Sequence, residues 1–304
     1  MEGPRTGHGR LVSSTPDLAS GKGHRDENFP VASVLIAPRH RPVVLAFYRV
    51  ARMSDDIADH PTAPPAEKLA RLQAIERSVT GEADAVPAAV TLRRALEERE
   101  LGAQHILDLL EAFRRDVGKA RYADWAELMD YCRYSAAPVG RFVLDVHGES
   151  RATWAASDGL CAALQVINHL QDCAKDYRDM DRVYVPLDSL RASGLEVVAL
   201  GDARASPALR QVIAALAART EGLLAQSSGL AGAVRDMRLS LEIGVIHRLA
   251  ASLARRLARR DPLSERVHHR PIEALGETLL GMGGALASRI GGSAKTQTGV
   301  IGAR

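Results

Sequence analysis

The sequence predicts an all-α protein that folds as a single domain. Strand signals are weak throughout the 304 residues, and the segments between turns are long and rich in Ala, Leu, Arg and Glu. Apolar residues recur three and four positions apart, for example at Ile106, Leu109, Leu110 and Phe113, which is the spacing of one helix face. We find no internal repeat and no linker. We therefore expect one continuous helical domain.

Pro- and Gly-containing turns divide this domain into roughly ten predicted helices. Two of them, 124–147 and 152–178, exceed the usual globular length, which is typical of a helical bundle or barrel. The complete set of predicted helices is 40–59, 65–79, 88–98, 102–117, 124–147, 152–178, 187–193, 206–228, 236–259 and 271–289.

Both ends of the chain have a different composition. Residues 1–25 and 291–304 are rich in small and polar residues and lack apolar periodicity. Such segments cannot bury enough apolar surface to become ordered. We expect a disordered leader over 1–25, a folded domain over 26–290 and a disordered tail over 291–304.

The composition argues against several classes of function. The chain has 40 basic and 37 acidic residues, and aromatic residues make up only 4%, so nucleic acid is not an expected partner. The three cysteines form no CxxC pair, which argues against a disulfide framework or a zinc site and favours a reducing compartment. No apolar run has the roughly 20 residues of a membrane span. We expect a soluble, cytoplasmic protein, with peripheral contact to the inner membrane left open.

A first group of residues that could perform chemistry lies at the end of the predicted helix 40–59. Asp55 and Asp59 are four residues apart and therefore share one helix face, about 6 Å apart. Arg52 precedes Asp55 by three residues on the same side. Like charges at this spacing destabilise a helix unless they bind a cation or are solvated. Alone, the pattern is equally typical of a charged surface turn.

A second group lies inside the predicted helix 152–178. Gln165, Asn168, Asp172 and Asp176 are spaced three, four and four residues apart and form one polar stripe. The rest of this helix is largely apolar, and a buried polar stripe is costly unless its members are paired or bind metal. A hydrogen-bonded core network is the alternative explanation for this stripe alone.

Together, the two stripes offer carboxylate and amide oxygens and no thiolate. Hard divalent cations prefer such ligands, and magnesium typically binds one or two carboxylates together with substrate phosphates. The chain has no GxxxxGK[ST] loop, so a phosphate group would have to be held by metal and by basic side chains. The sequence therefore predicts Mg²⁺ as cofactor. The basic candidates are Arg52, Lys119, Arg121, Arg182 and Arg266.

With these motifs in place, the chain resembles the squalene and phytoene synthases over about residues 26–275. Five segments occur in the same order as in that family. The first aspartate-rich motif is matched by AFYRVARMSDDIAD (46–59), and the central helix by YCRYSAAPVG (131–140). The second aspartate-rich motif is matched by QVINHLQDCAKD (165–176), and the loop after it by RVYVP (182–186). A C-terminal segment whose arginine reaches the diphosphate is matched by SERVHH (264–269).

The resemblance implies an isoprenoid-synthase helical barrel with a central cavity and an isoprenoid diphosphate lipid as substrate. It assigns magnesium to Asp55, Asp59, Asn168, Asp172 and Asp176. It assigns contact with the diphosphate, or protection of a carbocation, to Tyr48, Arg52, Arg182 and Arg266, and further substrate contacts to Tyr184 and Gln171. It assigns the lining of a lipid tunnel to Phe29, Tyr131, Ala136, Val139, Gly140 and Gln165.

Within this family, the segments DENFPVAS (26–33) and NHLQD (168–172) are most similar to the bacterial hydroxysqualene synthases of hopanoid pathways. Gln171 stands where many relatives carry Arg, and His247 falls near a position where many carry Tyr. The loss of a positive charge at 171 favours an enzyme that receives presqualene diphosphate ready-made over one that condenses two farnesyl diphosphates.

The expected reaction is magnesium-dependent ionisation of presqualene diphosphate, rearrangement, and water capture to give hydroxysqualene. The membrane surface and neighbouring squalene-pathway enzymes are the further partners left open. The alternatives are a condensing prenyltransferase that makes presqualene diphosphate, squalene or phytoene and, in another class, a non-catalytic assembly or binding protein of the same fold.

Overall fold

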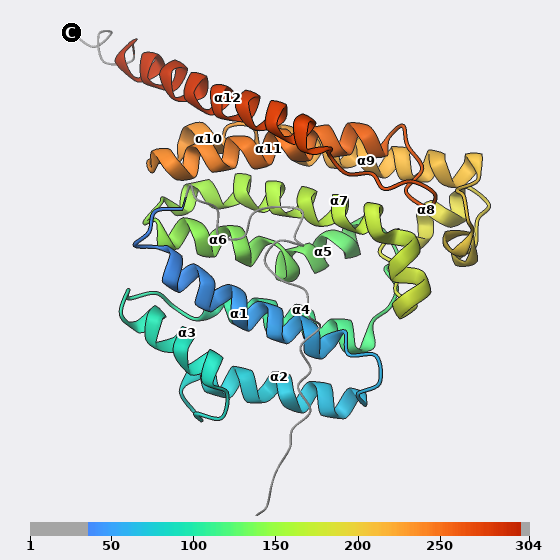
Figure 1. The fold of residues 1–304 in the computed structure, drawn as a ribbon, viewed down its shortest axis with the longest axis horizontal. Coiled ribbons are helices and arrows are strands. Elements are labelled where there is room, and N and C mark those ends of the chain that lie inside the picture. The colour runs from blue at the N-terminus through green and yellow to red at the C-terminus, as the bar shows by residue number, and fades with distance from the viewer. Residues whose placement is uncertain (1–35, 299–304) are drawn as a thin grey trace, which may run out of the picture.

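The computed structural model describes residues 36–298, and within this range all regular elements are helices. The helices lie in stacked tiers with their axes roughly along one direction (Figure 1). They are α1 (Arg41–Ala58), α2 (Pro65–Thr80), α3 (Pro87–Glu97), α4 (Gln104–Gly118), α5 (Trp125–Ser135), α6 (Ala137–Val146), α7 (Trp154–Met180), α8 (Leu187–Ala192), α9 (Pro207–Ser227), α10 (Leu230–Ala233), α11 (Met237–Leu257) and α12 (Pro271–Thr298), with 3-10 turns at Arg151–Thr153 and Val197–Gly201.

Local sequence signals set many of the helix starts. Asp124, Ser206 and Asp236 each accept a hydrogen bond from the backbone N–H three residues later, which caps α5, α9 and α11. Proline occupies the first turn of α1, α2, α3 and α9, where its missing N–H costs nothing. These signals explain why most predicted boundaries agree with the structure within two residues.

One prediction about the helices was wrong. The segment 124–147 is not continuous, because the backbone breaks at Ala136 between α5 and α6. Pro138 accounts for the break, since its ring would clash with the carbonyl of residue 134 in an unbroken helix. The short elements Val197–Gly201 and α10 were not predicted, because neither is long enough to show helical periodicity.

Helix α12 begins at Pro271 as predicted and runs to Thr298, beyond the predicted helix end at 289. The expected leader over 1–25 lies outside the described residues.

Two hydrophobic clusters form the core. One joins α1, α2, α3, α4 and the end of α6, and the other is built mainly from α5, α7, α9 and α11. Helix α1 belongs to the first cluster and α7 to the second, so the two aspartate-bearing helices approach each other where the clusters meet. Between residues 36 and 298, no helix has the length and apolar character needed to cross a membrane.

Candidate active site

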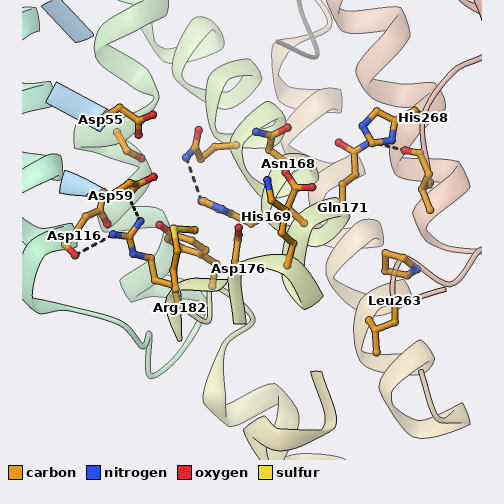
Figure 2. A pocket seen from close by; sticks show the side chains of 18 of the residues that line it. Asp55, Asp59, Asp116, Asn168, His169, Gln171, Asp176, Arg182, Leu263 and His268 are labelled. Carbon is orange, nitrogen blue, oxygen red and sulfur yellow. Dashed lines mark hydrogen bonds and ion pairs between the residues drawn. The ribbon is translucent and has the colours of Figure 1, made fainter. Parts of the chain in front are cut away.

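A polar cavity of about 940 Å³ lies between α1, α4, α5, α7 and the segment 262–268 that follows α11. Both predicted polar stripes face it: Arg52, Asp55 and Asp59 from α1, and Gln165, Asn168, Asp172 and Asp176 from α7. In Figure 2, Asp55 and Asp59 lie on one side of the cavity and Asn168 and Asp176 on the other. The structure therefore brings together residues that are more than a hundred positions apart in the sequence.

The α1 stripe is held by an arginine on the same helix. The Arg52 guanidinium contacts the Asp55 carboxylate at 3.0 Å and the Asp56 carboxylate at 2.6 Å. These contacts fix Arg52 at the cavity wall. There, one of its N–H groups can exchange its contact with Asp55 for a hydrogen bond to an incoming anion. Such exchange is possible because guanidinium has five donors in a planar fork.

Arg182 links the two sides of the cavity. Asp181 has the left-handed conformation (φ 50°), which ends α7 and reverses the chain. The side chain of Arg182 then contacts the Asp59 carboxylate at 2.7 Å and donates to the backbone carbonyl of Asp116 at 3.2 Å (Figure 2). Its exposed fraction is only 8%, so this positive charge is built into the floor of the cavity.

Two carboxyl groups of the stripes, those of Asp55 and Asp176, have raised pKa values. Burial, followed by repulsion from Asp59, raises the pKa of Asp55 to about 7, although 38% of its side chain is still accessible. Burial, followed by repulsion from Asp172, raises the pKa of Asp176 to about 7. Acids whose charged forms are disfavoured by burial and by one another are stabilised by a cation. The electrostatics therefore favour a metal ion or a similar positive charge between the stripes.

The donor set fits magnesium only when substrate oxygens complete the coordination. Across residues 36–298, no three Asp, Glu, His or Cys side chains converge closely enough to hold a metal by themselves. Magnesium usually binds one or two carboxylates together with phosphate oxygens and water, so an incomplete set on each wall is what such a site needs. Asp55 and Asp59 offer oxygens on one wall, and Asn168, Asp172 and Asp176 offer oxygens on the other.

Several further cavity residues were missed at the sequence level, among them Asp116 and His169. Asp116, near the end of α4, accepts a hydrogen bond from the Tyr131 hydroxyl at 2.8 Å, and burial raises its pKa to about 7. His169 stacks on Tyr184 with ring centroids 3.5 Å apart, and burial lowers its pKa to about 3, so the imidazole is neutral. Asp116 continues the apolar face of Leu109 and Ala112 at helical spacing, which was the available signal.

A second, apolar cavity of about 260 Å³ is lined by α6, α10 and α11 and by the turns of α1 and α7 that precede the polar residues. On α1, Ala51 lines the apolar cavity and Arg52 the polar one. On α7, Leu164 lines the apolar cavity and Gln165 the polar one. The two cavities therefore lie end to end. Val139 and Gly140, predicted to line a lipid tunnel, line the apolar cavity.

Several predicted residues have positions that refine their expected roles. Tyr48 lines the apolar cavity, one helical turn from Arg52 in the polar one. Tyr131, Tyr184 and Arg266 line the polar cavity, with Arg266 exposed at its rim.

Other predicted residues lie elsewhere. Ala136 is buried at the α5–α6 break and is not among the residues that line either cavity, because the break changes the helical phase expected for a continuous helix. Phe29 lies outside the described residues. Lys119 and Arg121, considered as phosphate ligands, instead form ion pairs with Glu127 and Asp181.

Gln171 has a structural contact in addition to lining the cavity. Its side-chain amide donates to the backbone carbonyl of Val267 at 2.5 Å, and the residue is buried. This bond fastens α7 to the segment that carries Arg266. The neutral amide at 171 therefore acts on the rim of the cavity through the backbone of residue 267.

Comparison with known proteins agrees with this site. The family model described as squalene/phytoene synthase matches residues 23–273. The chain is 55% identical to a hydroxysqualene synthase of Zymomonas mobilis, over 89% of this chain and 92% of the relative. It is also 55% identical to a hydroxysqualene synthase of Rhodopseudomonas palustris, over 86% and 90%. A phytoene synthase of Thermus thermophilus is 30% identical over 79% of this chain and 82% of the relative.

Solved structures share the fold. A squalene synthase from Alicyclobacillus acidocaldarius superposes with a TM-score of 0.67 at 32% identity, covering 75% of this chain and 87% of that one. A dehydrosqualene synthase superposes with a TM-score of 0.72 at 18% identity, covering 86% and 92%. The fold is therefore the all-α isoprenoid-synthase fold that the sequence predicted. The matched family model, the relatives and the two facing aspartate stripes together show that this chain belongs to the squalene/phytoene synthase family, whose members are enzymes that process isoprenoid diphosphates.

Proposed function

We propose that this enzyme converts presqualene diphosphate into hydroxysqualene, using Mg²⁺. The observation that carries the proposal is the end-to-end pair of cavities, one lined by carboxylates and arginines and the other by apolar side chains. A diphosphate ester with a long hydrocarbon fits this division. The 55% identity to two hydroxysqualene synthases supports this choice of substrate and product.

The polar cavity would promote departure of the diphosphate. When the carbon–oxygen bond breaks, the bonding electrons leave with the diphosphate, and negative charge grows on its oxygens. Arg52, Arg182 and Arg266 line the cavity and would stabilise that charge without moving far. Bound magnesium would supply further positive charge, held by Asp55 and Asp59 on α1 and by Asn168, Asp172 and Asp176 on α7.

The apolar cavity would hold the carbocation while it rearranges. Its wall is formed mainly by Val, Leu, Ile and Phe side chains, which offer no nucleophile and exclude bulk water. Tyr48 presents an aromatic ring on the same wall. Aromatic faces attract cations, so this ring would stabilise positive charge without reacting with it.

The proposal is tested with purified protein, magnesium and presqualene diphosphate in oxygen-18 water. We expect release of diphosphate and one labelled oxygen in hydroxysqualene, without dependence on NADPH. Squalene that appears only with NADPH would overturn the proposed product. Efficient conversion of farnesyl diphosphate alone would instead show a condensing prenyltransferase.

We also propose that the protein contacts the surface of the inner membrane through α12. This helix lies at one edge of the molecule (Figure 1) and is packed on α11 through its smallest residues. A Cβ atom on Gly281 would meet the Gly244 carbonyl oxygen at 2.6 Å, so the helices cross in close contact. Ala285 is buried at the same contact.

The outer face of α12 carries large apolar residues instead of charges. Its acidic residues point inward, where Glu273 pairs with Arg256 at 3.0 Å and Glu277 with Arg248 at 2.6 Å. A helix that packs through Gly281 and Ala285 and leaves its leucines exposed is typical of contact with an apolar partner. A bilayer is the partner we propose, because the lipid substrate and product partition into it. The exposed large residues are Ile272, Leu275, Leu279, Leu280 and Leu286.

Membrane contact is tested by flotation with vesicles of phosphatidylethanolamine and phosphatidylglycerol. We expect the protein to float with the vesicles and the double substitution Leu275→Lys, Leu279→Lys to abolish flotation. Leu69→Lys on α2, an exposed leucine at the opposite edge, is the control and should have no effect (Figure 1). A stable dimer that depends on the same two leucines, with no flotation, would assign the face to a second copy of the chain.

A further inference from the structure

The apolar cavity contains a buried carboxyl group. Glu242, on α11, lines this cavity and has an exposed fraction of only 5%. Leu239, Ile243 and Ile246 line the same wall, so Glu242 occupies a position on a stripe whose other members are apolar. Packing alone would favour leucine or isoleucine there, since a buried carboxyl group is costly.

Another buried glutamate shows what a purely structural role looks like in this protein. Glu149 is 8% exposed, and its carboxylate accepts hydrogen bonds from the backbone N–H groups of Arg235 and Asp236, both at 2.8 Å. These bonds anchor the chain just before α11, and Glu149 lines neither of the two cavities described above. Glu242 differs, because its side chain is part of the surface that would face the hydrocarbon of the substrate.

The reaction under "Proposed function" needs one polar group in this apolar space. A water molecule inside protein needs two to four polar partners, and an otherwise apolar cavity stays dry. The polar side chains of the apolar cavity come from three helices: Tyr48 from α1, Ser157 and Cys161 from α7, and Glu242 from α11. Gly140 keeps α6 close to two of them, since a Cβ atom there would meet Ser157 Oγ at 2.4 Å and Cys161 Sγ at 2.6 Å.

We propose that Glu242 is the catalytic base that holds the terminating water and receives its proton. This inference rests on the proposed function. The water oxygen donates a lone pair to the carbocation and forms the new carbon–oxygen bond. One O–H bond of the resulting oxonium breaks, and its proton passes to the Glu242 carboxylate. No oxidant or reductant is required. Tyr48 and Ser157 line the same cavity and would supply the remaining hydrogen-bonding groups for this water.

The test uses full-length protein carrying Glu242→Gln or Glu242→Leu, with presqualene diphosphate and magnesium. Diphosphate release and product identity are measured in the same reactions. We expect release to stay within about threefold of the original, because the ionising groups lie in the other cavity. We expect the hydroxysqualene share of the product to fall by at least about tenfold, in favour of hydrocarbons formed by proton loss or of rearranged alcohols.

Glu149→Gln is the matched control. It removes a buried carboxylate of structural role, so it should lower the melting temperature and leave the product ratio unchanged. Hydroxysqualene as the main product of both Glu242 variants would overturn the assignment, as would a loss of turnover at an unchanged product ratio. Failure of the original protein to release diphosphate from presqualene diphosphate would refute the proposed function instead. The glutamine variant keeps the shape of the side chain and is therefore decisive if the leucine variant does not fold.

Discussion

The two cavities share the walls formed by α1 and α7 and have opposite chemistry. On α1, one turn from Tyr48 to Arg52 separates an apolar wall from a charged one, and on α7 the change falls between Leu164 and Gln165. The polar cavity concentrates carboxylates whose pKa values are raised by burial, whereas most of the apolar cavity offers no polar atom. Under the proposed function, a shift of one turn along a helix would separate the residues that stabilise the leaving diphosphate from those that surround the carbocation.

The largest expected effect comes from the polar cavity. Asp172→Ala should reduce the rate of diphosphate release at least about a hundredfold, which corresponds to a loss of about 3 kcal/mol of charge stabilisation. Asp55→Ala, Asp59→Ala and Asp176→Ala should have effects of the same order. Release of diphosphate in saturating magnesium is the measurement.

Asp179→Ala is the control for these variants, because Asp179 is an exposed carboxylate on the same helix. Normal turnover of the Asp172 variant would show that the metal site was wrongly assigned to α7. A large loss in the Asp179 variant would show that net charge on α7, and not position, governs the rate.

A smaller effect is expected from the apolar cavity. In Gly140→Ala, the new Cβ atom would displace Ser157 and Cys161, whose side-chain atoms lie 2.4 and 2.6 Å from its position. The cavity should become narrower, and we expect about a tenfold loss of turnover, from roughly 1–2 kcal/mol of strain. Magnesium dependence should not change. Gly222→Ala on α9 is the matched control, because nothing lies within 4 Å of its Cβ position. A wild-type rate for Gly140→Ala would show that the cavity is not tightly occupied during the reaction.

The predicted fold was correct because its signals are local and repeated. Helical periodicity and capping residues fixed most boundaries, and the aspartate stripes could be placed on one helix face each. The break at Ala136 was missed, although Pro138 was visible, because the apolar pattern continues across it. Periodicity describes each helix and carries little information about a change of direction between two helices.

The predicted site was incomplete because some members have no partner in the nearby sequence. Asp116 and His169 join the site through Tyr131 and Tyr184, and these contacts form only after folding. Glu242 gave no signal either, since a single glutamate on a helix is usually solvated. From the sequence, we interpreted Gln171 only as the loss of the positive charge that many relatives carry at this position. The structure adds a hydrogen bond from its side chain to the backbone of residue 267.

The smallest predicted effect concerns stability, and it should also separate the two cavities. The pKa of Asp176 is raised from 3.8 to about 7 in the folded chain, so between these values the native state binds more protons than the unfolded state. The contribution of Asp176 to stability is therefore most favourable at low pH. It declines as the pH rises through the folded pKa and reaches its minimum above about pH 7.

Asp176→Asn should consequently raise the melting temperature of the metal-free protein at pH 8 by a few degrees, since 1 kcal/mol corresponds to about 2–4 °C in a chain of this size. The gain should shrink at pH 5.5, where the carboxyl group is already protonated in the folded state. Magnesium together with inorganic pyrophosphate should stabilise the original protein more at pH 8 than at pH 5.5, because protons compete for the same oxygens. Gly140→Ala should show neither dependence, as its strain involves no titrating carboxylate. Thermal melts at the two pH values, with and without magnesium and pyrophosphate, measure all of these effects. An equal gain in melting temperature for Asp176→Asn at both pH values would mean that the pKa of Asp176 is not raised in the folded protein. The electrostatic contrast between the two cavities would then rest on Asp55 and Asp116.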